Sequence, residues 1–535
     1  MDREHWLLRD APYASYDDYR RATGESALDK ARALQPEAIV DELGRAGLRG
    51  RGGAGFPIAT KWRSILRHEC PTRFAVCNAA EGEPGTFKDR YLLRRDPYSM
   101  LEGLMIAAHV VGARECFVAT KASFVPELAR IRAAIEELTA AGVTDGLKFH
   151  VIEGPEEYLF GEEKALLEVC DGNDPLPREP HYPPYEWGLR ATQRSPNPAV
   201  VNNVETFSRV PGILRAGAES FRAIGTSDTS GPLIFTISGD VQRPGVYERA
   251  AGITLKELFY DVAGGPRKGR AFKAALSGVS TAVITADRFD CQADHASLHL
   301  IGAGLGSAGF ILYDDLVSMP RVAQSVARFL YVESCNQCPA CKHGLRTASS
   351  AIDELFDPKT ATADDIERAF YGARHAPQGN RCYLPVQGAT LVPNLLTRFA
   401  AEFQAQLHAP ADAPPPYVIP KIVEFDEANG TFVYDELQQR KRPNWTYEPA
   451  PTPAPTKPKR EPRDASPPEI EAPPMSTPQR TKPAKPAARP PGIETVSVRL
   501  MADVRERLTH VVKDEAQLDA VVNAALREWM TGRGA

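Results

Sequence analysis

Apolar and polar positions follow strand and helix periods over the first two hundred residues of the chain. Short apolar runs at residues 73–77 and 115–120 predict buried strands. Residues 96–109 and 125–140 have helical spacing and are predicted as helices. Strands that alternate with helices are typical of an α/β layer, so we expect an α/β domain over residues 1–225.

The pattern changes after residue 225. Residues 232–239 are predicted as a strand, and residues 243–247 as a turn that leads into another strand, so we expect a small β-rich domain over residues 226–320. Residues 321–408 have helical spacing, with cysteines at a loop and its flanks. A chain of 535 residues is too long for one hydrophobic core, which agrees with three or more domains.

The C-terminal part is predicted as a linker followed by a tail. Residues 409–493 are expected to be Pro-rich and mostly disordered, because residues 441–491 hold 16 prolines and almost no aliphatic clusters. Residues 494–535 suggest a short strand and two helices, an order that resembles ribbon–helix–helix modules. We expect this tail to associate with a second copy or a partner. DNA binding is less favoured, since Arg499 is the only basic residue on the candidate strand.

Composition narrows the class of protein. Hydrophobic residues make up 43% and charged residues 25%, and the net charge of −5 gives no overall attraction to nucleic acid or acidic membranes. The most apolar helix candidate, residues 100–119, is interrupted by charged residues and predicts a buried helix without membrane insertion. The N-terminus lacks a secretory pattern, and nine cysteines in so long a chain are no disulfide framework. We therefore expect a cytoplasmic protein, at most peripheral to a membrane complex.

Four cysteines supply the strongest chemical signal. Cys335, Cys338 and Cys341 follow one another at intervals of three, and Cys382 comes about forty residues later. Three thiols at this spacing can reach three corners of one cluster, and a distant fourth can close a [4Fe–4S] site. Structural zinc sites usually come as two separated C-x2-C pairs. A [4Fe–4S] cluster is therefore the favoured prediction, with zinc or unliganded thiols as alternatives.

A glycine-rich stretch supplies a second signal. Five glycines stand among residues 47–55, and their backbone N–H groups could turn toward an anion. Arg51 and Lys61 add positive charge suited to a phosphate. The stretch is neither a dinucleotide fingerprint after a strand nor a P-loop ending in Gly-Lys-Ser/Thr. Taken alone, it also fits a plain flexible turn.

Further motifs follow in series. They are Cys77-Asn-Ala-Ala-Glu-Gly-Glu-Pro-Gly-Thr-Phe-Lys-Asp-Arg90, Tyr158-Leu-Phe-Gly-Glu-Glu-Lys-Ala-Leu166 and Ala199-Val-Val-Asn-Asn-Val-Glu-Thr206. Together with the glycines and cysteines, these motifs resemble the flavin-bearing, NADH-oxidising subunit of respiratory complex I. The same family includes the diaphorase subunits of NAD-linked hydrogenases and formate dehydrogenases. The resemblance covers residues 40–405, and residues 238–248 look like the family's small β-grasp domain. It implies an α/β protein with an FMN-binding α/β domain, a β-grasp domain and a helical [4Fe–4S] domain.

The resemblance also implies cofactors and the residues that hold them. The cofactors would be FMN and one [4Fe–4S] cluster, with NADH as substrate and NADPH as an alternative. The residues that would cradle the FMN phosphate and ribityl chain are Gly50, Arg51, Gly52, Gly53 and Lys61. Those that would line the flavin are Asn78, Glu81, Gly161, Glu162, Glu163, Asn202 and Asn203. Phe56, Glu83 and Tyr182 would face NADH, and Cys335, Cys338, Cys341 and Cys382 would hold the cluster. Hydride transfer strictly requires no protein acid or base, so no catalytic residue is named. Without the family, Glu162 and Glu163 would fit a solvated helix start.

Three positions depart from the family pattern. Ala80 stands where the family commonly has an aspartate, and Ser64 where many members have a large apolar residue. Glu179 falls where a lysine is usual, and Arg178 or His181 could compensate for its negative charge. Each departure weakens the dinucleotide prediction more than the FMN prediction.

Three functional hypotheses remain open at this point. The first is an NAD(P)H-linked FMN/iron–sulfur electron-transfer subunit, a diaphorase-type oxidoreductase. The second keeps FMN and the cluster but uses a non-nicotinamide donor or acceptor. The third is a non-enzymatic scaffold with a dimerising or DNA-binding tail. Because no second cysteine set precedes the glycine stretch, we expect a thioredoxin-like [2Fe–2S] protein as a separate subunit, beside further redox subunits.

Overall fold

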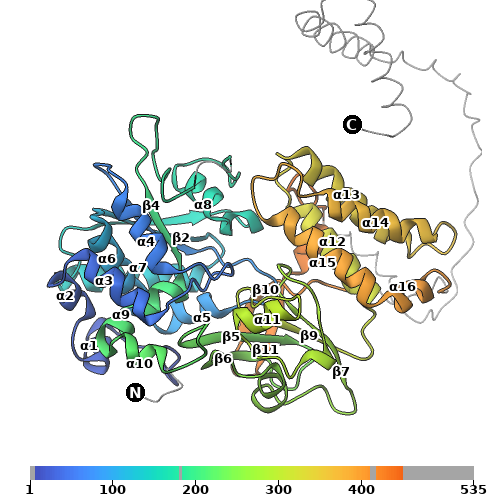
Figure 1. The fold of residues 1–535 in the computed structure, drawn as a ribbon, viewed down its shortest axis with the longest axis horizontal. Helices are drawn as coiled ribbons and strands as arrows, with labels where there is room; N and C mark the ends of the chain where they lie inside the picture. The colour runs from blue at the N-terminus through green and yellow to red at the C-terminus, as the bar shows by residue number, and fades with distance from the viewer. Residues whose placement is uncertain (1–5, 180–182, 410–416, 450–535) are drawn as a thin grey trace, which may run out of the picture. The chain divides into compact units, whose positions relative to one another are not determined.

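A four-stranded parallel sheet organises the N-terminal part of the protein (Figure 1). The structure is a computed structural model that describes residues 6–179, 183–409 and 417–449, all within the unit Met1–Thr452. The strands are β1 (Phe74–Ala79), β2 (Glu115–Lys121), β3 (Lys148–Gly154) and β4 (Ala199–Asn203), in the order β3-β2-β1-β4. The chain runs from β1 to β2 and β3 on one side and returns to β4 on the other. The strand order therefore reverses between β1 and β4, where open α/β sheets commonly bind ligands at the carboxyl ends of their strands.

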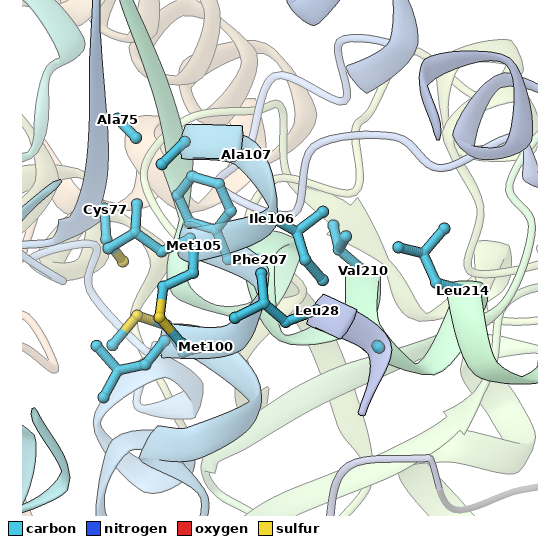
Figure 2. Packing of buried hydrophobic residues seen from close by; sticks show 14 of the residues in the cluster. Leu28, Ala75, Cys77, Met100, Met105, Ile106, Ala107, Phe207, Val210 and Leu214 are labelled. Atoms are coloured by element: carbon cyan, nitrogen blue, oxygen red, sulfur yellow. The ribbon is translucent and has the colours of Figure 1, made fainter. Parts of the chain in front are cut away.

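Helices pack around this sheet because their apolar faces cover it. Helix α6 is buried along almost its whole length and packs against α9, so closely that a Cβ at Gly103 would lie 2.0 Å from the carbonyl oxygen of Phe207. Figure 2 shows Met105 and Ile106 of α6 beside Phe207 and Val210 of α9. The helices of this part are α1 (Tyr16–Thr23), α2 (Ala27–Arg32), α3 (Pro36–Ala46), α4 (Ile58–Arg67), α5 (Lys88–Arg95), α6 (Pro97–Val111), α7 (Val125–Ala140), α8 (Glu163–Cys170), α9 (Val204–Ala216) and α10 (Ala218–Arg222), with a 3-10 turn η1 (Tyr158–Gly161).

A second, mixed sheet of five strands follows, in the order β6-β5-β9-β7-β8. Strand β5 is parallel to β9, and the other neighbours are antiparallel. Its elements are β5 (Pro232–Gly239), β6 (Gly245–Ala250), the π-helix η2 (Glu257–Val262), β7 (Phe272–Ser277), β8 (Ile284–Thr285), η3 (Ala286–Arg288), α11 (His295–Leu300) and β9 (Gly309–Asp314). An aromatic core around Phe259 and Phe310 fills the space under this sheet.

Five helices form the next part and share one apolar core with residues such as Leu330, Leu345 and Leu391. They are α12 (Met319–Glu333), α13 (Pro339–Glu354), α14 (Ala363–His375), α15 (Leu384–Arg398) and α16 (Ala400–Gln406). In the described parts of the chain, no helix is long and apolar enough to cross a membrane. The predicted apolar helix over residues 100–119 is not one element: residues 100–111 belong to α6, and residues 115–119 belong to the buried strand β2.

Part of the segment predicted as a linker is folded. Residues 417–449 contain the hairpin β10 (Ile422–Asp426) and β11 (Thr431–Tyr434) and the 3-10 turn η4 (Glu436–Arg440). Ile422 and Phe432 pack against Phe87 at the start of α5. The rest of the predicted linker, apart from its first residue, and the tail of residues 494–535 lie outside the described residues. The mixed α/β architecture is confirmed.

Candidate functional site

A cavity of about 1060 Å³ opens at the carboxyl ends of β1 and β4, where the strand order reverses. Its walls come from all three parts of the described chain. The N-terminal part contributes the glycine loop and the turn at Tyr158–Gly161, and the second sheet contributes Ser280 and His295. Leu384 and Gln387 of α15 close the far side, beside Cys382. The cavity thus extends from the glycine stretch to Leu384, two residues after Cys382.

The glycine loop fits closely against its neighbours. The N–H of Gly50 donates to the carbonyl of Phe56 over 2.9 Å, and Gly55 adopts a positive φ of 61°. A Cβ at Gly55 would lie 2.4 Å from Cε1 of His295, and one at Gly52 would lie 3.2 Å from Cβ of Asn203. The loop therefore presents backbone to the cavity at Gly50, Gly52 and Gly53, where any side chain would take up space.

Arg51 differs from the expectation that its side chain would line the cradle. It is 4% exposed, donates to the carbonyl of Ser230 over 2.7 Å and is not among the residues of the cavity wall. Two of its nitrogens, Nε and Nη1, have no partner within the described chain. Burial lowers the pKa of Arg51 to about 10, while Glu205 opposes that shift. A buried cation with unused donors behind a glycine loop suits an anionic ligand group.

Polar side chains gather at the ends of β1 and β4. Asn78 donates to the carbonyl of Gly161 over 2.8 Å, and Lys61 donates to Glu163 over 2.7 Å and to the carbonyl of Val201 over 3.0 Å. Asn202 and Asn203 also line the cavity. The structure brings these residues together: the asparagines lie on the adjacent parallel strands β1 and β4, and Lys61 reaches them from α4.

Lys88 was not selected from the sequence, although it lies in the motif that carries Glu81 and Glu83. Its ammonium group is buried and contacts Asp89 at 2.8 Å, Glu205 at 3.1 Å and the Asn203 amide oxygen at 3.2 Å. Despite its burial, these carboxylates hold the pKa of Lys88 above its ordinary value. Lys88 is therefore a fixed positive charge in the cavity wall.

Two of the predicted carboxylates cap helices. Glu81 accepts from the N–H of Asp89 over 3.0 Å at the start of α5, and Glu162 accepts from the N–H of Ala165 over 2.9 Å at the start of α8. Burial is the main cause that raises the pKa of each to about 7. Glu162 thus caps the start of α8, in keeping with the helix start expected without the family resemblance. Glu162 and Glu163 also line the cavity.

Glu83 joins the three parts of the chain. It accepts from the hydroxyl of Tyr158 over 2.5 Å and from the N–H of Val279 in the second sheet part over 2.7 Å. Gln387 of α15 donates to the same Tyr158 hydroxyl over 2.7 Å. Burial raises the pKa of Glu83. Val279 and Gln387 escaped the sequence analysis, and Tyr158 was part of a motif but received no role, because all three are far from Glu83 along the chain.

The predicted NADH side is only partly described. The Phe56 side chain lines the cavity and is 47% exposed, whereas Tyr182 lies outside the described residues. Ala80 lines the wall and Ser64 does not. Glu179 forms an ion pair with Arg381, next to Cys382, so Arg381 supplies the compensating charge expected from Arg178 or His181.

The cysteines lie where the helices of the third part begin and end. Cys335 follows α12, Cys338 precedes α13, Cys341 lies in its first turn and Cys382 stands just before α15. Cys338 and Cys341 are buried, and Ser334 Oγ lies 3.3 Å from Cys341 Sγ. No three His, Cys, Asp or Glu side chains in the described chain are close enough to hold one metal ion. Cysteine sulfurs that bind one zinc ion lie roughly 3.8 Å from one another, whereas those that bind a [4Fe–4S] cluster lie farther apart.

The described fold thus combines two features. One is an α/β crevice with a glycine loop and a buried cation suited to an anion, and the other is a helical part that carries four cysteines. Family models agree: residues 43–212 match the Nuo51 FMN-binding domain, and residues 321–406 match the NADH-ubiquinone oxidoreductase-F iron-sulfur binding region. The crevice fits FMN, since backbone lines its glycine loop and Arg51 keeps unused donors beside it.

Relatives that match about three quarters of this chain identify its family more closely. An F subunit of NADH-quinone oxidoreductase from Rhizobium meliloti is 36% identical over 405 residues, which cover 73% of this chain and 93% of the relative. The F subunit from Aquifex aeolicus is 34% identical, with coverages of 75% and 93%. A crystal structure of NAD⁺-reducing [NiFe]-hydrogenase in the H₂-reduced state matches with a TM-score of 0.66 and 31% identity, covering 78% of this chain and 69% of that one.

The chain therefore belongs to the family of NADH-quinone oxidoreductase F subunits. It is an NADH-linked FMN/iron–sulfur electron-transfer subunit and an oxidoreductase, and its cofactors are FMN and a [4Fe–4S] cluster. The first of the three functional hypotheses is thus confirmed in preference to the other two.

Proposed function

We propose that FMN binds in the crevice between β1 and β4 and that NADH enters over Phe56. The observation that carries this proposal is the single cavity that runs from the glycine loop to Leu384, next to Cys382. When bound, FMN accepts two electrons from NADH together and releases them singly. The four cysteines would hold the cluster that receives these electrons.

The residues of this chain then have distinct tasks. The glycine loop at Gly50, Gly52 and Gly53 would meet the phosphate, with the backbone N–H groups of Gly52 and Gly53 as donors and with Lys61 and the buried Arg51 as supporting charges. Lys88 would hold a fixed positive charge beside the ring system. Asn78, Glu81, Gly161, Glu162, Glu163, Asn202 and Asn203 would line the flavin and exclude water from it.

Phe56 and Glu83 would face the nucleotide. An exposed ring at the cavity mouth suits stacking against an adenine, and we assign Tyr182 to the same side from the motif alone. The Glu179–Arg381 ion pair supports the nucleotide assignment, because it neutralises the carboxylate that departs from the family pattern. An anaerobic titration with both nucleotides shows whether the protein prefers NADH or NADPH.

The domain arrangement and partners complete the proposal. The assigned domains are residues 1–225 for FMN and NADH, 226–320 as a β-grasp unit and 321–408 for the cluster; the strand order of the second sheet supports the β-grasp assignment. The protein would act in the cytoplasm within a multi-subunit complex, where a separate thioredoxin-like [2Fe–2S] subunit and further redox subunits exchange electrons with it. The tail of residues 494–535 would associate with a partner or a second copy.

An anaerobic absorption titration of the purified chain with NADH, then NADPH, tests the proposal. NADH should bleach the flavin band first and the broad cluster absorption next. Phe56→Ala should raise the NADH concentration needed for half-bleaching about tenfold, the cost of one lost aromatic contact, without loss of FMN. Tyr371→Ala, which removes another exposed ring, should leave the titration unchanged. Flavin that dithionite reduces but neither nucleotide does would overturn the nicotinamide site.

A further inference from the structure

Residues 417–449, here named the C-terminal strap, contact all three parts of the described chain. In Figure 1 the orange strands β10 and β11 lie beside α5 and the second sheet. The strap follows residue 406, where the second family match ends, so neither matched region contains it. Its contacts are therefore a feature of this chain that the two family models do not describe.

The strap first holds the flavin part and the second sheet. Phe432 packs on Phe87 with ring centroids 6.1 Å apart, and Glu424 forms a bidentate ion pair with Arg94 of α5. The carbonyl of Pro420 accepts from the N–H of Gly85, in the loop that carries Glu81 and Glu83, over 2.8 Å. On the second sheet, Tyr417 meets the ring of Tyr313.

The strap also reaches the loop of the first cluster ligand. Arg328 of α12 donates to the carbonyl of Gln439 over 2.8 Å. Asn336, directly after Cys335, donates to the carbonyl of Pro443 over the same distance. The backbone on the C-terminal side of Cys335 is thus held by the strap.

Glu333 is the point where these contacts converge. It is fully buried at the end of α12, two residues before Cys335. Its carboxylate accepts from Lys441 over 2.7 Å and from Gln438 over 2.9 Å, both in the strap. It also accepts from the backbone N–H of Tyr158 over 3.1 Å. Tyr158 begins the turn whose last carbonyl, at Gly161, receives the hydrogen bond from Asn78.

These bonds form a short path between the two cofactor sites. From the end of β1 it runs through Asn78, the turn at Tyr158–Gly161 and Glu333 to Cys335. The carboxylate is buried, and Lys441 is its only cationic hydrogen-bond partner in the described chain. Removal of one partner of a buried pair leaves a charge without compensation, which is strongly unfavourable. Without Lys441, Glu333 would keep Gln438 and the Tyr158 N–H as its hydrogen-bond partners in the described chain, with Lys421 as a second, weaker source of positive charge.

We propose that Lys441 of the strap is a positioning residue for electron transfer: by holding Glu333 in place, it fixes the turn at Tyr158–Gly161, which lines the flavin cavity, against the loop of Cys335. Because electron tunnelling slows steeply with distance, a small change in this spacing alters the flavin-to-cluster step. Reaction of NADH with the flavin, which does not cross this contact, should remain.

The test uses the full chain with both cofactors and three variants. Lys441→Met keeps the length of the side chain and removes its charge, Lys441→Arg restores a cation, and Lys359→Met is the matched control at an exposed lysine. Amide hydrogen exchange is measured at residues 157–161, at 334–337 and in α6. Stopped-flow absorption separates flavin bleaching by NADH from the later bleaching of the cluster.

In Lys441→Met, exchange at residues 157–161 and 334–337 should accelerate at least about tenfold while α6 stays protected. Cluster bleaching should slow by about the same factor, with flavin bleaching changed less than about twofold. Lys441→Arg should recover most of both effects, and Lys359→Met should show neither. Wild-type exchange at both segments, or an unchanged rate of cluster bleaching, overturns the proposal.

A fourth variant, Gln438→Leu, tests the same contact if Lys441→Met unfolds the whole chain. Gln438→Leu removes one hydrogen bond to the same carboxylate and keeps the ion pair. Its exchange should rise at the same two segments by about threefold, as expected for one buried hydrogen bond. If Gln438→Leu changes neither segment, the positioning role is wrong.

Discussion

At the scale of single residues, Lys121 makes the sharpest prediction. It is 1% exposed at the end of β2 and, among the described residues, donates only to the carbonyl of Glu156, over 3.2 Å. Burial, reinforced by repulsion from Lys421 and Lys441, lowers its pKa to about 7, against weaker attraction from Glu156 and Glu333. Between that pH and its ordinary pKa of 10.5, the unfolded chain binds more protons than the folded chain. Stability from this group therefore rises with pH in that window and is lost as the pH falls.

Lys121→Met should remove this pH dependence. Between pH 7 and 9 the wild-type chain should gain about 2 kcal/mol relative to the variant's own change over the same range. Urea unfolding of both chains at the two pH values measures the difference, and Lys359→Met should follow the wild type. Parallel pH profiles for wild type and Lys121→Met would mean that folding does not lower the pKa of Lys121.

Residues close together in one motif were easier to place from the sequence than residues brought together by the fold. The structure brings Asn78, Asn202 and Lys61 together, the two asparagines because β1 and β4 are adjacent and parallel, and Lys61 because it donates from α4 to the Val201 carbonyl of β4. His295 could not be found in that way, since it reaches Gly55 from the second sheet part across 240 positions of chain. Arg51 was selected for its positive charge, but its side chain turns to the Ser230 carbonyl, which no local pattern encodes.

At the scale of elements, the two cofactor sites rest on separate cores. The cysteines lie between helices whose own core includes Leu330, Leu345 and Leu391, whereas the flavin crevice rests on α6 and α9. Cys338→Ser should therefore abolish the [4Fe–4S] cluster, seen as loss of iron and sulfide, while FMN and its bleaching by NADH persist. Cys291→Ser, at a cysteine outside the site, should keep both cofactors. Loss of FMN together with iron in Cys338→Ser would show that the sites depend on each other.

The elements with strong periodicity were predicted well. Helix α7 has the predicted bounds of residues 125–140, and α6, β1 and β2 begin or end within two residues of expectation. The hairpin β10–β11 was missed because residues 409–493 were assigned together by their proline content, although two short apolar runs flank Asn429-Gly430. Phe432 is buried and Phe425 partly buried against Phe87, just before α5, and Tyr91 of α5, more than 300 positions away. Contacts of that range leave no periodic signal in the sequence.

At the scale of the whole molecule, all described residues belong to one compact unit, Met1–Thr452. Both cofactor sites and the C-terminal strap belong to that unit, so a chain ending at residue 452 should retain FMN, iron and bleaching by NADH. The tail of residues 494–535 is too small to bury a core by itself, and its predicted strand and helices need a second surface. Removal of the tail should therefore change association and leave the chemistry intact.

Light scattering on three chains separates the tail from the linker. The full chain should associate in a concentration-dependent way with a second copy, while chains ending at 493 and at 452 should both be monomeric. Because an association held by two short tails is a bimolecular equilibrium, dilution should also dissociate the full chain. If the full chain is monomeric at every concentration, the tail does not pair with itself, and its partner must be another protein of the complex. If the chain ending at 493 still associates while the chain ending at 452 does not, the linker and not the tail carries the contact.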